Sequence, residues 1–194
     1  MKVYLKSEMF TDREYVLVEN KSLKATAFRY STGVEALKVE NDRGYFIILP
    51  FMGQQIWRMF FDGRDLTMKT TFEEPIPDVL YLQTYGGFLY HCGISSVGAP
   101  DESHLQHGEI PNIRYKEAYI DTDEDENGAY LTGSNDYIVS IGMMYPKEDP
   151  EIIIYAATQK PSHSSNSALT NPIKELVKNI SKYKGIYSDI KSNN

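Results

Sequence analysis

The sequence predicts a mainly β protein, and three of its features indicate this class. Short segments rich in β-branched and aromatic residues recur along the 194-residue chain, which is typical of strands. Aromatic residues make up 12% of the chain, with Tyr the most frequent among them. Pairs such as Asp62-Gly63 and Asn127-Gly128 separate the segments and favour tight hairpin turns. Many short strands of this kind indicate an antiparallel sandwich or barrel rather than a parallel α/β sheet.

The individual strands follow from local patterns. The first segments are bounded by turn-forming or charged residues, and Pro50 ends the fourth because proline has no N–H to donate. The segment 54–61 alternates two faces, so the Asp62-Gly63 turn returns the chain as a partner strand. The expected strands cover residues 14–20, 23–30, 34–41, 45–49, 54–61, 64–69, 86–94, 114–120, 129–132, 136–145 and 151–159.

The character of the chain changes after residue 159. A Ser/Pro-rich stretch, 160–170, predicts a linker. A capping residue at Asn171 and apolar residues at helical spacing then predict a short amphipathic helix, followed by a frayed tail. We therefore expect a β domain over residues 1–159, and a linker, helix and tail over 160–194.

Composition excludes several classes of partner. The formal net charge of -7 argues against a nucleic-acid partner, because phosphate binding needs a clustered basic face. The N-terminal segment has no apolar stretch of the signal-peptide kind, and no apolar run approaches the roughly 20 residues of a membrane span. Cys92 is the only cysteine, so no internal disulfide forms. We expect a cytoplasmic protein without nucleic-acid or membrane partners.

The residues best suited to chemistry lie between Tyr85 and Asn112. Three of the four histidines, His91, His104 and His107, fall in this stretch among several carboxylates. Imidazole and carboxylate groups close together are what general acid–base chemistry requires, since His titrates near neutral pH. The alternative is that each His is a hydrogen-bonded loop residue, but three in one stretch favour a functional site.

A metal site is the first alternative, with Cys92, His104 and His107 as ligands. Their spacing matches no zinc pattern, and the second half of a paired motif is missing. The acidic run 121–126 resembles the start of a calcium loop, but Glu126 stands where that loop needs Gly. We therefore expect no metal and no cofactor.

Three motifs resemble a known superfamily. They are Gly-Gly-Phe-Leu-Tyr-His-Cys-Gly-Ile (86–94), Val-Gly-Ala-Pro (97–100) and Leu-Gln-His-Gly-Glu-Ile-Pro-Asn (105–112). In that order they resemble the aldose 1-epimerase, or galactose mutarotase-like, superfamily, and in particular its less characterised branch. The strand pair around residues 53–65 also resembles this family. The likeness covers roughly residues 15–145.

The resemblance implies a fold and an activity. The family fold is an antiparallel β-sandwich with a sugar cleft on one concave face, and the reaction interconverts the anomers of an aldose through an acid and a base. By resemblance His107 matches the sugar-contacting His of the His-Gly motif, and His91 lies on the strand leading into the same cleft. These two are the expected catalytic residues. The expected substrate-binding residues are Arg58, Gln54, His104 and Glu109.

The chain departs from the family towards its C-terminus. Family members are longer and place their acid His and base Glu in the C-terminal half, whereas residues 177–194 contain no histidine. The resemblance therefore implies a shortened member with an incomplete sandwich that lacks part of the catalytic pair. Two hypotheses follow: a protein that binds a monosaccharide, or a non-catalytic remnant or interaction module that self-associates through an open sheet edge.

Overall fold

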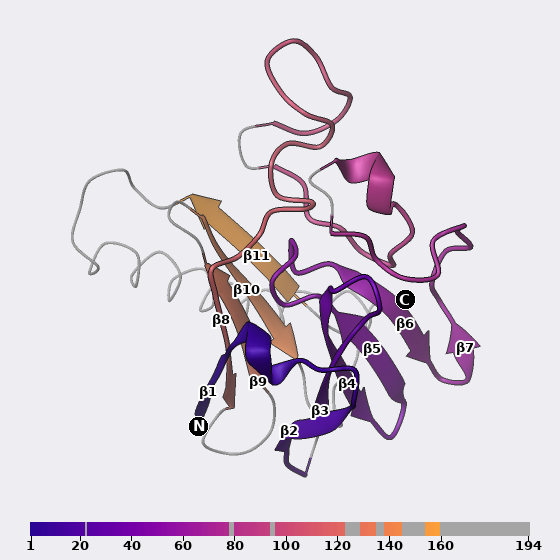
Figure 1. Cartoon of the computed structure of the whole chain (residues 1–194), viewed down its shortest axis with the longest axis vertical. Helices are drawn as coiled ribbons and strands as arrows, with labels where there is room; N and C mark the ends of the chain where they lie inside the picture. The colour runs from indigo at the N-terminus through magenta and orange to yellow at the C-terminus, as the bar shows by residue number, and fades with distance from the viewer. Residues whose placement is uncertain are drawn as a thin grey trace, which may run out of the picture. The chain divides into compact units, whose positions relative to one another are not determined.

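The computed structural model describes residues 1–21, 23–77, 80–93, 96–122, 129–134, 138–144 and 154–159 (Figure 1). The chain divides into two units, Met1–Gln159 and Lys160–Asn194. The expected linker, helix and tail fall in the second unit, outside the described residues. Within the part of the chain that the structure describes, no helix is long and apolar enough to cross a membrane.

The first unit is mainly β, as the sequence predicts, and its strands form two antiparallel sheets. The six-stranded sheet has the order β2-β3-β4-β5-β6-β7, so each strand pairs with its neighbour in sequence. Its strands are β2 (Tyr15–Glu19), β3 (Lys24–Arg29), β4 (Glu35–Asn41), β5 (Gly44–Ile48), β6 (Ile56–Phe61) and β7 (Arg64–Asp65).

The five-stranded sheet has the order β1-β8-β9-β10-β11. Its first strand comes from the N-terminus and pairs with β8, so that Val3 lies opposite Ile120. The strands are β1 (Lys2–Leu5), β8 (Glu117–Thr122), β9 (Ala129–Ser134), β10 (Ile138–Met144) and β11 (Ile154–Gln159). Two short 3-10 helices, η1 (Ser7–Met9) and η2 (Tyr81–Thr84), complete the described elements.

The predicted hairpin at Asp62-Gly63 is confirmed. Both residues have positive φ, 49° and 73°, which is the backbone that tight hairpin turns require. Phe61 pairs with Arg64 across the turn. The returning strand is shorter than expected, because the hydroxyl of Thr67, rather than a backbone carbonyl, accepts the N–H of Met59.

The expected strand over residues 86–94 does not form over its described part, residues 86–93, where a single isolated bridge joins Leu89 to Ile56. The hydroxyl of Tyr90 explains the difference, since it accepts the backbone N–H groups of Gly86 (2.7 Å) and Gly87 (2.6 Å). These donors are therefore not available for a strand ladder. The segment forms a loop that the Tyr90 side chain holds in place.

One hydrophobic cluster contains buried side chains from both sheets. The six-stranded sheet contributes Ala25, Ala27 and Leu37, and the five-stranded sheet contributes Ala118 and Ile120. Ala25 and Ala27, like Ala118 and Ile120, are two residues apart, as expected for one face of a strand. Burial of these apolar faces is the main stabilising contribution to such a core.

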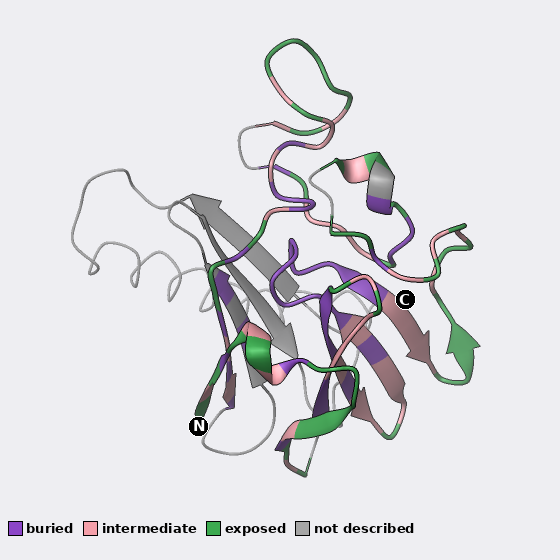
Figure 2. Ribbon diagram, in the orientation of Figure 1, coloured by how far each residue is buried: buried purple, intermediate pink, exposed green. Residues whose placement is uncertain are grey.

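The connection between β5 and β6 is buried throughout, as Figure 2 shows. Its backbone groups bond to the segment that precedes β8. The N–H of Gly53 donates to the carbonyl of Ile113 (2.8 Å), and the N–H of Tyr115 donates to the carbonyl of Phe51 (2.9 Å). Gly53 is needed here, because a Cβ atom would lie 2.1 Å from the carbonyl oxygen of Pro111. This contact fixes the loops with the candidate site against the six-stranded sheet.

Candidate functional site

The His-Gly pair at 107–108 adopts a left-handed backbone, with φ of 62° at His107 and 79° at Gly108. Two backbone bonds of 2.8 Å hold it: the N–H of His107 donates to Gly98, and the carbonyl of His107 accepts from Gly93. A Cβ atom at Gly108 would lie 2.4 Å from the carbonyl oxygen of Ser96. Because no side chain fits there, the glycine allows the two loop segments to approach closely.

The ring of His107 belongs to an aromatic cluster, which we define as Tyr81, Tyr85, Tyr90 and His107. The rings of Tyr81 and His107 meet edge to face, with 4.7 Å between their centroids. The Tyr81 ring also contacts the rings of Tyr85 and Tyr90, at centroid distances of 5.2 and 5.3 Å. Tyr85 and Tyr90 stack at 5.8 Å. Burial raises the pKa of the Tyr81 hydroxyl above its ordinary value, and the neighbouring Tyr85 and Tyr90 raise it further. The cluster therefore offers the neutral phenol of Tyr81 together with aromatic edges.

A pocket of about 280 Å³ opens beside this cluster, and we call it the tyrosine pocket. Tyr81, Gln106 and Asn112 supply its polar groups, and the rest of its lining is mainly apolar. The side-chain nitrogen of Asn112 is buried and has no hydrogen-bond partner among the described residues. An unbonded buried amide is unfavourable, so a ligand that accepts a hydrogen bond from it is stabilised. The full lining is Leu80, Tyr81, Leu82, Pro100, Leu105, Gln106, Gly108, Pro111 and Asn112.

His91 lies in a more buried position. Burial lowers the pKa of its imidazole to about 4, and a hydrogen bond with the backbone of Gln54 opposes this shift only in part. The imidazole is therefore neutral at neutral pH and accepts protons weakly. Gln54 itself is fully buried, with a positive φ of 48°. Its amide nitrogen would be 2.8 Å from a Cβ atom at Gly133, so the side chain extends towards β9.

The guanidinium of Arg58 binds backbone carbonyls. It donates to Phe72 (3.0 Å) and Glu73 (2.9 Å) through one nitrogen, and to Trp57 (3.1 Å) and Gly86 (3.2 Å) through the other. Its plane also lies over the Trp57 ring at 4.5 Å. Arg58 therefore ties two loop segments to β6, which places it as a positioning residue for the loop that leads to Tyr90 and His91.

The other two expected residues lie at the edge of the site. His104 bonds within its own turn, through Nδ1 to the carbonyl of Leu105 (2.9 Å) and through Nε2 to Asp101 (3.2 Å). Glu109 follows the His-Gly pair and is half-buried. Over the described ranges, no group of three or more His, Cys, Asp and Glu side chains is placed to hold a metal ion. Cys92, His104 and His107 are thus not brought together as a ligand set.

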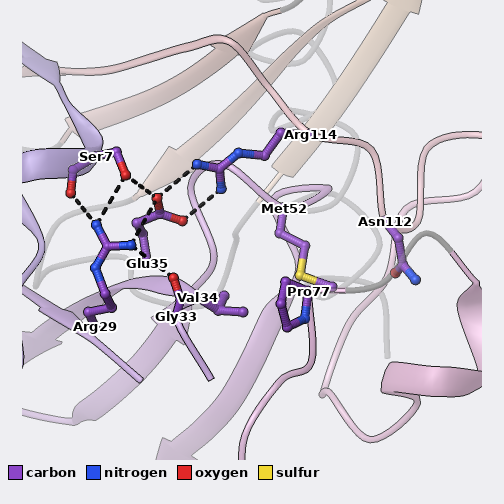
Figure 3. Close-up of a pocket in the computed structure, with 9 residues that line it drawn as sticks. All are labelled: Ser7, Arg29, Gly33, Val34, Glu35, Met52, Pro77, Asn112 and Arg114. Carbon is purple, nitrogen blue, oxygen red and sulfur yellow. Dashed lines mark hydrogen bonds and ion pairs between the residues drawn. The ribbon is translucent and has the colours of Figure 1, made fainter. Parts of the chain in front are cut away.

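A second pocket, of about 430 Å³, was not predicted from the sequence (Figure 3). We call it the arginine pocket, because Arg29 and Arg114 line it on either side of the buried Glu35. Arg29 and Glu35 are cross-strand partners at the β3–β4 turn, so this pair could have been predicted from the local sequence. Arg114 is 79 residues from Glu35, and no local pattern indicates that contact. Asn112 lines both pockets.

Comparison with known proteins identifies no family, since no protein-family model and no solved structure matches the chain. A function therefore has to rest on the residues and contacts described above.

Proposed function

We propose that this chain is an aldose 1-epimerase-like protein that binds a monosaccharide in the tyrosine pocket. The observation that supports this best is the placement of His107. Its backbone is fixed in the left-handed region, and its ring packs on Tyr81, which lines the tyrosine pocket. His107 is not itself a lining residue, but its chain neighbours Gln106 and Gly108 are. We further propose that the two antiparallel sheets belong to a sandwich of the galactose mutarotase-like type.

The chemistry of the pocket suits a sugar ring. A monosaccharide presents apolar C–H faces together with hydroxyl groups, so it binds where aromatic rings adjoin a few hydrogen-bonding groups. Tyr81 provides the ring, while the amides of Gln106 and Asn112 provide donors and acceptors. The volume of about 280 Å³ lies just below the usual range for ligand pockets and suits a single sugar ring.

The remaining candidate residues take supporting roles in this proposal. His91 is a neutral imidazole at neutral pH, held through the backbone of Gln54, and its lowered pKa of about 4 makes it only a weak proton acceptor. Arg58 holds the loop that contains Gly86. Anomer exchange needs an acid and a base on the same sugar. We therefore propose binding as the primary activity, with anomer exchange as a separate and measurable property.

Saturation-transfer NMR on a panel of aldoses tests the proposal. At least one aldose should receive saturation from the protein, and the signal should fall at least tenfold in Tyr81→Leu because the aromatic wall is removed. Tyr4→Leu is the matched control, since Tyr4 is an exposed tyrosine whose ring pairs with Tyr119 in the five-stranded sheet. Faster exchange between the two anomers in the presence of the protein would show that it catalyses the reaction as well as binding the sugar. The absence of transfer to every aldose would overturn the proposal.

A second candidate, an interaction module that self-associates, is favoured by one observation. The rim of the tyrosine pocket exposes leucine side chains, with 62% of Leu82 and 54% of Leu105 accessible. Apolar groups gathered in this way favour protein association. Sedimentation velocity over a wide range of protein concentrations separates the two functions. Oligomers that disappear in Leu82→Ser/Leu105→Ser support the module, and a monomer at every concentration contradicts it.

A further inference from the structure

The arginine pocket is built around a buried carboxylate that is fully engaged. Glu35 is 3% exposed, and both terminal nitrogens of Arg114 bind it, at 2.7 and 2.8 Å (Figure 3). The hydroxyl of Ser7 donates to the same group at 2.5 Å. Burial alone would raise the pKa of Glu35, but the hydrogen bonds from Arg114 and Ser7 outweigh burial and lower it to about 2. The carboxylate is therefore ionised at any physiological pH.

Arg29 contributes charge to this pocket but few free donors. Its Nε donates to the carbonyl of Phe10 (2.8 Å), and one terminal nitrogen donates to the carbonyl of Gly33 (2.9 Å) and lies 3.5 Å from Glu35. Its other terminal nitrogen donates to both oxygen atoms of Ser7. Because its N–H groups are used in this way, Arg29 is a fixed structural cation of the pocket.

The charges lining the pocket do not cancel. Arg29 and Arg114 supply two positive charges against the single negative charge of Glu35, and the other lining residues are uncharged. One positive charge is left in a pocket of about 430 Å³, on a chain whose net charge is -7. A partly enclosed site of this sign attracts anions locally, although the whole protein repels them.

Arg114 also keeps a second binding edge. A guanidinium has five N–H donors, and Glu35 uses one on each terminal nitrogen. Among the described residues, Nε of Arg114 has no hydrogen-bond partner, and the side chain is 57% exposed. The guanidinium lies over the Phe51 ring at 5.0 Å, which restrains its orientation. Nε and the adjacent terminal nitrogen can therefore bind a second oxyanion side-on, through two parallel N–H groups.

We propose that the arginine pocket is a binding site for a small oxyanion, the carboxylate or phosphate group of a metabolite, held by the free edge of Arg114. Glu35 and Phe51 hold the guanidinium in place, and Arg29 supplies the excess positive charge. This site lies in a different pocket from the tyrosine pocket, although Asn112 lines both, and the proposal does not depend on sugar binding. It gives the chain a second ligand of a different chemical class.

The test uses the whole chain, with inorganic phosphate and sodium acetate as separate probes and sodium chloride as the ionic-strength control. Arginine Nε–H signals are followed by ¹H–¹⁵N NMR. We expect a saturable shift of the Arg114 signal with phosphate, acetate or both, and no saturable shift with chloride. Preference for phosphate identifies a phosphoryl group as the ligand, and preference for acetate identifies a carboxylate. If the Arg114 signal shifts with neither phosphate nor acetate, the proposal is overturned.

Variants check that the site is specific. Arg114→Lys keeps the charge but removes the planar edge, so affinity should fall by about tenfold or more. Arg43→Lys is the matched control, because Arg43 pairs with the exposed Asp62 through Nε and a terminal nitrogen. This variant should bind phosphate or acetate with the affinity of the parent. Equal losses in the two variants would indicate general attraction to positive charge and would overturn the proposal. If Arg114→Lys fails to fold, the signal of the parent protein decides.

Discussion

The ring of His107 meets the ring of Tyr81 edge to face, with 4.7 Å between the ring centroids and 72° between their planes. Each partner is fixed independently. His107 is held by its left-handed backbone and two backbone hydrogen bonds, and Tyr81 is held by its contacts with Tyr85 and Tyr90. The candidate site therefore depends on the loop backbone as much as on the two side chains.

His107→Asn should weaken sugar binding at least tenfold while leaving the fold intact. Asn tolerates a left-handed backbone better than most residues, so this change removes the ring without straining the loop. The measurements are saturation-transfer NMR for binding and thermal unfolding for stability. His107→Ala removes the same ring but tolerates the left-handed backbone less well than Asn, so it should bind as weakly and melt lower than His107→Asn. Sugar binding by His107→Asn at the level of the parent would mean that the site is wrongly placed.

Two glycines of the same loop separate backbone strain from steric contact. Gly98 and Gly108 both have positive φ, 92° and 79°, but only Gly108 has atoms within 4 Å of its absent Cβ position. Gly98→Ala should cost about 1 kcal/mol of unfolding free energy, from backbone strain alone. Gly108→Ala should cost several kcal/mol in total, about 3 or more, because its Cβ would meet the carbonyl of Ser96. Urea unfolding measures both, and equal costs would contradict the close approach of the two loop segments.

The sequence predicts the architecture of this protein better than its loops. Turn chemistry and alternation predict the strands that become β2 to β7 and the hairpin between β6 and β7, and every pairing in this sheet joins neighbours in the chain. The strand expected over residues 86–94 is wrong because the Tyr90 hydroxyl takes the N–H groups of two glycines, and no local pattern indicates that contact. β1 was not predicted, since its partner β8 is more than a hundred residues away along the chain.

The candidate site, too, was predicted from the sequence only where its residues are close together in the chain. The sequence shows that His91, His104 and His107 lie in one stretch, but it does not show their environments. The structure buries His91, bonds His104 within its own turn and packs His107 against Tyr81. The arginine pocket was missed because its central pair, Glu35 and Arg114, is 79 residues apart. Contacts between segments that are far apart in the chain cannot be predicted from local sequence patterns and become apparent only in the folded structure.

The buried imidazole of His91 should make stability depend on pH in a defined window. Its pKa is about 4 in the folded chain against an ordinary value of 6.5, so below pH 6.5 the unfolded chain binds a proton that the folded chain does not. Stability should be unaffected by this group above pH 6.5, and fall by up to about 3 kcal/mol as the pH drops towards 4. Histidine C2–H signals report the pKa directly. His91→Asn should remove this part of the pH dependence, and a midpoint near 6.5 in the parent would contradict the burial of the ring.

Glu35 should control a separate and more acidic window. Its pKa is lowered from 4.5 to about 2, so its contribution to stability is fully present above pH 4.5 and is lost as the pH falls towards 2. A shift of this size corresponds to about 3 kcal/mol. Glu35→Gln should destabilise the protein at neutral pH by about 3 kcal/mol or more, because Arg29 and Arg114 lose their shared buried counter-ion. It should also flatten the pH dependence below 4.5.

Glu40→Gln is the matched control for Glu35→Gln. Glu40 lies in the same strand, β4, and its carboxylate pairs with Lys24 and Lys38 at the surface. Surface pairs of this type contribute less than about 1 kcal/mol and weaken in salt, because solvent and counter-ions screen them. Urea unfolding of the two variants at low and high salt makes the comparison. A large, salt-resistant loss for Glu35→Gln beside a small loss for Glu40→Gln identifies the buried Glu35 carboxylate as the stabilising partner, whereas equal small losses would show that Glu35 is solvated.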